Sequence, residues 1–170
     1  TAFLPAVTLD GIEVSLNLNI SGKTTKEEIK AVSPDGIGLL RTELLYMKSN
    51  SFPDEEEQLA SYNEIIKNFD EKSSIIIRTL DIGADKQLPY FQMKNEMNSF
   101  LGLRGIRFSL SEKNIFKIQL RAILRAAYNR NVKLMYPMIT NISEIREANI
   151  LLEEVKKELK QEGKNFKEDI

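Results

Sequence analysis

Short apolar runs alternate with amphipathic stretches along the chain, and this rhythm predicts its secondary structure. Apolar and polar residues alternate over residues 12–20, with Ile12, Val14, Leu16, Leu18 and Ile20 on one face, which is typical of a strand. Apolar runs at 37–40, 75–77 and 132–138 predict three further strands. The β-branched run 75–77 has no polar alternation, as in a strand that is buried on both faces.

Amphipathic segments separate these strands and predict helices. Thr25 to Glu28 has the pattern of a capping box, and Pro53 followed by the acidic residues 54–57 is typical of a helix N-terminus. Apolar residues recur at helical spacing in three longer segments, which are Leu59–Phe69, Phe116–Ala127 and Ile145–Leu159. Gly163 is expected to end the last helix.

The predicted elements alternate between strand and helix along the whole chain. This order indicates an α/β fold of parallel (β/α) units joined by right-handed crossovers. Four such units could form an open doubly wound sheet or about half of a TIM-type (β/α)8 barrel, and the pattern alone leaves both open. The connection from Asp81 to Leu110 is longer than the usual connection, so we expect it to be functional or to have structure of its own.

Composition narrows the function classes. The chain has 170 residues, the length of one domain, and its 24 basic and 25 acidic residues give a net charge of −1, which argues against nucleic acid or an anionic membrane as a partner. It contains neither cysteine nor histidine, which excludes disulfides, thiolate or imidazole metal sites and a phosphohistidine on this chain. No apolar stretch is long enough for a membrane span and no signal peptide is visible, so we expect no membrane insertion and a cytoplasmic location.

Arginines follow two of the predicted strands at the edge where α/β folds bind ligands. Arg41-Thr42 follows the run 37–40, and Arg78-Thr79 follows the run 75–77. A buried guanidinium needs an anionic partner, and two at equivalent strand ends favour a shared anionic ligand. The alternative is internal pairing, of Arg41 with Glu43 or of Arg78 with Asp81.

A third arginine, Arg104, lies in the glycine-containing segment 100–105, while Arg107 and Lys86 are weaker candidates. No cluster of acidic residues has the spacing of a metal site, and we expect no metal ligand and no catalytic residue on this chain.

Five segments of the chain have a distinctive sequence, namely residues 36–43 (GIGLLRTE), 77–90 (IRTLDIGADKQLPY), 100–107 (FLGLRGIR), 119–126 (QLRAILRA) and 136–139 (YPMI). They resemble the enzyme I family, the phosphoenolpyruvate-protein phosphotransferases of the bacterial sugar phosphotransferase system. The second segment is the most specific. Pyruvate phosphate dikinase and phosphoenolpyruvate synthase share a first segment like this one but differ around the second.

The resemblance implies that residues 1–170 are the first part of a phosphoenolpyruvate-binding (β/α)8 barrel, ending before its fifth strand. It implies that Arg41, Arg78 and Arg104 bind phosphoenolpyruvate, with Asp85 and Lys86 in a loop beside the site. In this family the phosphoryl group passes to an enzyme histidine with Mg²⁺ and then to the carrier protein HPr. The histidine and the metal ligands belong to other parts of the family's chain, so we expect this chain alone to be inactive.

Two readings from other classes stay open beside this one, namely a non-catalytic anion-binding or regulatory module and a scaffold in which the arginines are structural. We also expect the chain to form a homodimer. Half a barrel leaves two sheet edges and the apolar inner face of its strands without partners, and pairing with a second copy would cover them.

Overall fold

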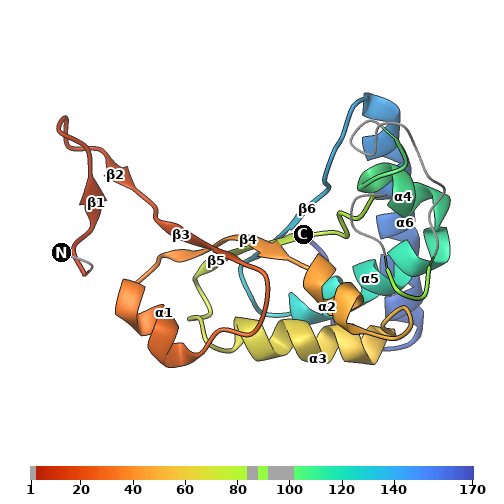
Figure 1. The fold of residues 1–170 in the computed structure, drawn as a ribbon, viewed down its shortest axis with the longest axis horizontal. Helices are drawn as coiled ribbons and strands as arrows, with labels where there is room; N and C mark the ends of the chain where they lie inside the picture. The colour runs from red at the N-terminus through yellow and green to blue at the C-terminus, as the bar shows by residue number, and fades with distance from the viewer. Residues whose placement is uncertain (1–2, 84–87, 92–101) are drawn as a thin grey trace.

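The computed structural model describes residues 3–83, 88–91 and 102–170, and its centre is a four-stranded parallel sheet (Figure 1). The strands are β3 (Asn17–Ile20), β4 (Gly36–Arg41), β5 (Ser74–Arg78) and β6 (Val132–Met135), and they lie side by side in chain order. A doubly wound sheet reverses its strand order at a switch point, whereas a barrel is wound in one direction. The order β3-β4-β5-β6 is therefore that of half a barrel and confirms the predicted fold class.

Helices α1 (Lys26–Val32), α3 (Glu55–Ile66) and α5 (Lys113–Ala126) pack on one face of this sheet. The core between them joins strand residues such as Ile37, Ile75 and Ile77, all fully buried, to Tyr62 of α3 and Ile123 of α5. Two short helices, α2 (Glu43–Lys48) and α4 (Ile106–Ser111), follow the carboxyl edge of the sheet, and α6 (Ile142–Gln161) packs on α4 and α5. The capping boxes at Thr25 and Asp54 are present, and Gly163 follows the end of α6 with a positive φ of 67°.

The first predicted strand is wrong over residues 12–16. Here β2 (Glu13–Val14) forms an antiparallel hairpin with β1 (Ala6–Val7), and Figure 1 shows this hairpin extending away from the sheet. The cause lies in the neighbouring strand, because β4 begins at Gly36 opposite Asn17 and offers nothing to pair with further upstream. Asp35 instead bonds both the N–H and the C=O of Leu16 and ends the ladder there. The fourth strand is also shorter than predicted, ending at Met135 ahead of Pro137.

Candidate functional site

The two Arg-Thr turns lie next to each other at the carboxyl edge of the sheet. β4 ends at Arg41 and β5 ends at Arg78, and these two residues are direct partners in the parallel register. Thr42 ties the turns together, since its hydroxyl donates a 3.0 Å hydrogen bond to the carbonyl of Arg78. The structure therefore brings together the two arginines that the sequence places at strand ends.

Arg78 is held by two buried carboxylates. Its guanidinium forms ion pairs with Glu43 of α2 and, at 3.2 Å, with Asp81, which follows β5. Both acids are nearly inaccessible to solvent, and the Arg78 side chain is 18% exposed. Internal pairing is thus realised for Arg78, but Glu43 pairs with this arginine rather than with Arg41. Nε of Arg78 is buried and has no hydrogen-bond partner within the described residues, which leaves one donor of the guanidinium available.

Arg104 joins the same cluster through Asp81. Its Nε lies 3.1 Å from one oxygen of Asp81 while Arg78 contacts the other oxygen, so one carboxylate holds two guanidinium groups. Gly105, the next residue, donates to the carbonyl of Ile82, and the N–H of Ile106 donates to Pro137 beyond β6. These bonds fix Arg104 at the edge where β5 and β6 end.

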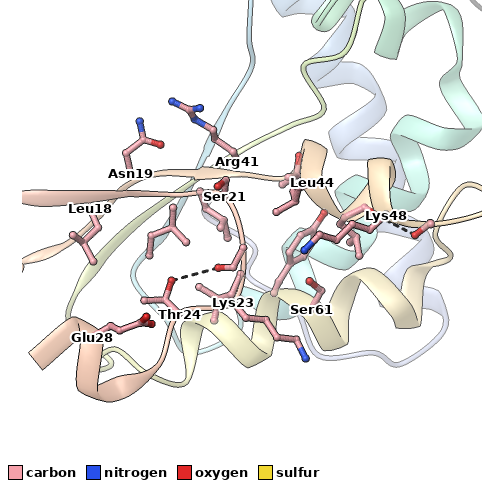
Figure 2. Close-up of a pocket in the computed structure, with 18 of the residues that line it drawn as sticks. Leu18, Asn19, Ser21, Lys23, Thr24, Glu28, Arg41, Leu44, Lys48 and Ser61 are labelled. Atoms are coloured by element: carbon pink, nitrogen blue, oxygen red, sulfur yellow. Dashed lines mark hydrogen bonds between the residues drawn. The ribbon is translucent and has the colours of Figure 1, made fainter. Parts of the chain in front are cut away.

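Arg41 differs from the other two arginines because its side chain is exposed. Figure 2 shows its guanidinium pointing away from Lys23 and Ser61, which lie on the helix-covered side of the sheet. No carboxylate of the described residues forms an ion pair with Arg41. The three arginines and two acids of this edge carry a formal charge of +1, which favours an anion as ligand.

Gln119 of α5 forms hydrogen bonds with both turns, and the sequence analysis did not identify it. Its Oε1 accepts a 2.9 Å hydrogen bond from the N–H of Leu80, and its Nε2 donates to Thr42 at 3.1 Å and to the Tyr62 hydroxyl at 3.4 Å. Gln119 is 1% exposed, so these bonds replace those that water would make. A glutamine on the otherwise apolar side of this amphipathic helix was the available signal.

Of the three remaining candidates, only Arg107 lies within the described residues. Asp85 and Lys86 lie outside the described residues. Arg107 is half-buried in α4. Desolvation raises the pKa of Glu144, but hydrogen bonds from Thr140 and Asn141, together with the positive charge of Arg107, lower this pKa below its ordinary value. This places Arg107 beside the N-terminus of α6 rather than beside Asp81.

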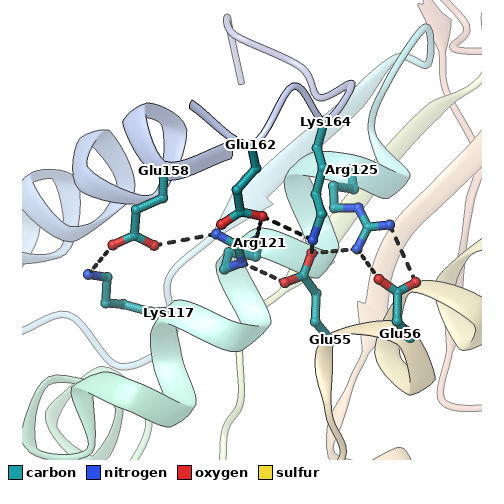
Figure 3. Close-up of polar contacts among 8 residues, drawn as sticks. All are labelled: Glu55, Glu56, Lys117, Arg121, Arg125, Glu158, Glu162 and Lys164. Carbon is teal, nitrogen blue, oxygen red and sulfur yellow. Dashed lines mark hydrogen bonds and ion pairs between the residues drawn. The ribbon is translucent and has the colours of Figure 1, made fainter. Parts of the chain in front are cut away.

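A second charged cluster joins the outer helices (Figure 3). Arg121 of α5 contacts Glu55 of α3 at 2.5 Å and Glu162, just past α6, at 2.6 Å. Arg125 pairs with Glu55 and with Glu56. Glu55 and Glu56 belong to the acidic run predicted as a helix N-terminus, and the structure shows that they also bind the arginines of α5. Since each cation here is balanced by acids, the cluster holds helices together and offers no site for an anion.

The described part of the chain offers neither a metal site nor a membrane span. Within residues 3–83, 88–91 and 102–170, no three His, Cys, Asp or Glu side chains gather into a group that could hold a metal ion. Over the same residues, no helix has the length and apolarity needed to cross a membrane.

Comparisons with known proteins show the family to which the chain belongs. Residues 2–170 match the family described as PEP-utilising enzyme, PEP-binding domain, where PEP is phosphoenolpyruvate. The chain is 44% identical over 169 residues to the phosphoenolpyruvate-protein phosphotransferase of Bacillus subtilis, covering 98% of this chain and 29% of that protein. It is 45% identical over 167 residues to the protein of the same name from Priestia megaterium, covering 96% of this chain and 28% of that protein. The chain thus spans less than a third of the length of these relatives. By its sequence and its half-barrel topology, it belongs to the PEP-utilising enzymes, as part of their PEP-binding domain.

Proposed function

We propose that residues 1–170 form the first half of a (β/α)8 barrel in a phosphoenolpyruvate-protein phosphotransferase, and that Arg41, Arg78 and Arg104 bind phosphoenolpyruvate. The observation that carries the proposal is the cluster at the carboxyl edge, where Asp81 holds Arg78 and Arg104 together and Arg41 is the register partner of Arg78. The names of the relatives supply the substrate and the reaction.

The chemistry of phosphoenolpyruvate suits this cluster. The molecule carries a phosphate and a carboxylate, and a guanidinium meets either group with two parallel hydrogen bonds. Phosphoryl transfer needs positioning and stabilisation of charge more than covalent chemistry from the protein. Arg78 and Arg104 are pre-oriented by buried acids and need little reorganisation, while the exposed Arg41 can close on the ligand from the open side. Asp85 and Lys86, which lie outside the described residues, are the further substrate-binding residues of this proposal.

Other parts of the reaction would come from outside these residues. The chain has no histidine, so the phosphoryl group would move from the enol oxygen of phosphoenolpyruvate to a histidine elsewhere in a longer polypeptide, and from there to HPr. Glu43 and Asp81 are committed to arginines, and the described residues contain no other acidic cluster suited to a metal. The Mg²⁺ of the proposed reaction would therefore have its ligands in another part of the polypeptide.

The test is the substitution Arg78→Lys in the full-length natural polypeptide, measured as phosphoenolpyruvate-dependent phosphorylation of HPr. An ammonium cannot reproduce the bidentate contact, so kcat/KM should fall. The expected decrease corresponds to a loss of about 2–4 kcal/mol in transition-state stabilisation. Arg146→Lys, on the exposed side of α6, is the matched control and should leave kcat/KM unchanged. Equal kinetics in the two variants would make Arg78 a structural residue. Binding of phosphoenolpyruvate without transfer to HPr, in the unsubstituted polypeptide, would favour the non-catalytic module.

A further inference from the structure

A cavity of about 700 Å³ lies on the helix-covered side of the sheet, between α1, α2 and α3. Its walls include the aliphatic side chains of Val32, Leu40, Leu44, Leu45 and Ile65. The exposed fraction of Val32 is 53%, and Leu44 and Leu45 are only half-buried, so these walls are not closed by the packing of the domain. Small-molecule sites have volumes of about 300–1,000 Å³ and mostly apolar walls, and this cavity has both properties.

Two lysines give the cavity a positive rim. Lys23 follows β3 and Lys48 ends α2, and Figure 2 shows both side chains beside the cavity. Neither ammonium group forms an ion pair with a carboxylate in the part of the chain that the structure describes. Glu28 is the one acidic residue of the lining, and its carboxylate is already bonded to the N–H and hydroxyl of Thr25. The rim therefore attracts an anion, while the walls attract an apolar group.

Of the three arginines of the proposed site, only Arg41 is among the residues that line this cavity. Arg78 and Arg104 do not line it, and the guanidinium of Arg41 points to the other side of the sheet in Figure 2. Every lining residue lies between positions 18 and 65, within the first two (β/α) units, and three of them belong to β3, an edge strand of the sheet. The gap exists because α1 has only seven residues and leaves the sheet uncovered beside α3.

We propose that this cavity binds a small amphipathic organic anion, with its apolar body against Leu40, Leu44 and Ile65 and its carboxylate or phosphate between Lys23 and Lys48. Thr42 also lines the cavity, so a bound molecule would contact the turn that carries Arg41. The proposal does not depend on the proposed function, because its test is direct binding in the absence of phosphoenolpyruvate.

The experiment measures binding of three probes by calorimetry to the natural polypeptide that contains these residues. Octanoate has both an apolar chain and a charge, octanamide has the chain without the charge, and acetate has the charge without the chain. We expect saturable binding of octanoate, weaker binding of octanamide and none of acetate. The double variant Lys23→Ala/Lys48→Ala should weaken octanoate about tenfold, or about 1.4 kcal/mol, without changing octanamide.

Two further variants make the result specific to this cavity. Lys30→Ala, on the exposed face of α1 and outside the lining, is the matched control and should leave octanoate binding unchanged. Ser61→Trp places an indole in the cavity from α3 and should weaken octanoate and octanamide together, with its thermal transition checked first. The proposal is overturned if octanoate does not bind saturably, if it binds no more tightly than octanamide, or if the lysine double variant behaves like Lys30→Ala.

Discussion

Gln119 connects α5 to both arginine-bearing turns, and the variant Gln119→Leu tests whether this buried amide fixes the site. Leucine has a similar size and can fill the space, so packing is largely kept. What is lost is the acceptor for the N–H of Leu80 and the donor to Thr42 and Tyr62. The hydroxyl of Thr42 still donates to Arg78, and that of Tyr62 still donates to Gln58, so the N–H of Leu80 is the one group left without a partner.

The loss of stability in Gln119→Leu follows from the hydrogen bonds that are lost. A buried donor without an acceptor costs about 1–3 kcal/mol, and each lost hydrogen bond contributes about 0.5–1.5 kcal/mol. The 3.4 Å contact with Tyr62 is weak, and the added apolar surface of leucine offsets part of the loss. We therefore expect the free energy of unfolding to fall by about 2–4 kcal/mol. Gln161→Leu makes the same change at the exposed end of α6 and should alter stability by less than about 0.5 kcal/mol.

Two measurements decide the outcome. Urea unfolding gives the loss of stability for both variants, and hydrogen exchange of the Leu80 amide reports the bond itself. In Gln119→Leu this amide should exchange faster by more than the global loss of stability accounts for. If Gln119→Leu matches Gln161→Leu in urea and the Leu80 amide stays protected, the glutamine does not hold the turns.

Three other changes test separate features. Gly105→Ala should cost about 1–3 kcal/mol in thermal unfolding, because φ is +55° and a Cβ would lie 3.1 Å from Met138; Gly163→Ala, also at positive φ but in open space, should cost less. Hydrogen bonds from Arg121 and Lys164 lower the pKa of Glu162 to about 2. The contribution of Glu162 to stability is therefore present above pH 4.5 and is lost as pH falls towards 2. The free energy of unfolding of Glu162→Gln, measured from unfolding curves, should decline less over this pH range than that of the unsubstituted protein. Self-association should appear in sedimentation velocity at micromolar concentration and disappear when residues 1–14 are removed, whereas a wild-type monomer would refute it.

The sequence predicted those elements that depend on local pattern. The strands at 37–40 and 75–77, the capping box at Thr25, the helix start at residues 53–57 and the three long helices all appear, since periodicity and end signals act within one element. The strand at 12–20 failed over its first half because alternation describes a half-buried strand without saying which strand it pairs with. Register with β4 decided that question, and β4 begins too late to hold residues 12–16.

The arginines of the site were predictable because a strand end is a local feature that the topology carries to one edge. Their partners were not. The alternative of internal pairing placed Glu43 with Arg41, two residues away. Because β4 and β5 lie side by side, Glu43 instead pairs with Arg78, 35 residues further along the chain. A proximity argument along the sequence favours the nearest charge, whereas the sheet makes the neighbour in the next strand the closer one.

The distribution of exposed apolar residues changes where self-association should arise. An apolar inner face was expected. The side of the sheet away from the helices does carry the half-buried Leu39 and Ile76 and the exposed Met135, but it also carries exposed polar residues, namely Asn17, Asn19, Arg41 and Lys133. These polar side chains keep their hydration in the absence of a partner, which lowers the hydrophobic drive of that face. The large exposed apolar residues gather instead in the N-terminal hairpin and its flanks: Phe3, Leu4, Val7, Leu9, Ile12, Val14 and Leu16. Apolar area left in water drives association, so the hairpin rather than the sheet face should control whether two copies bind.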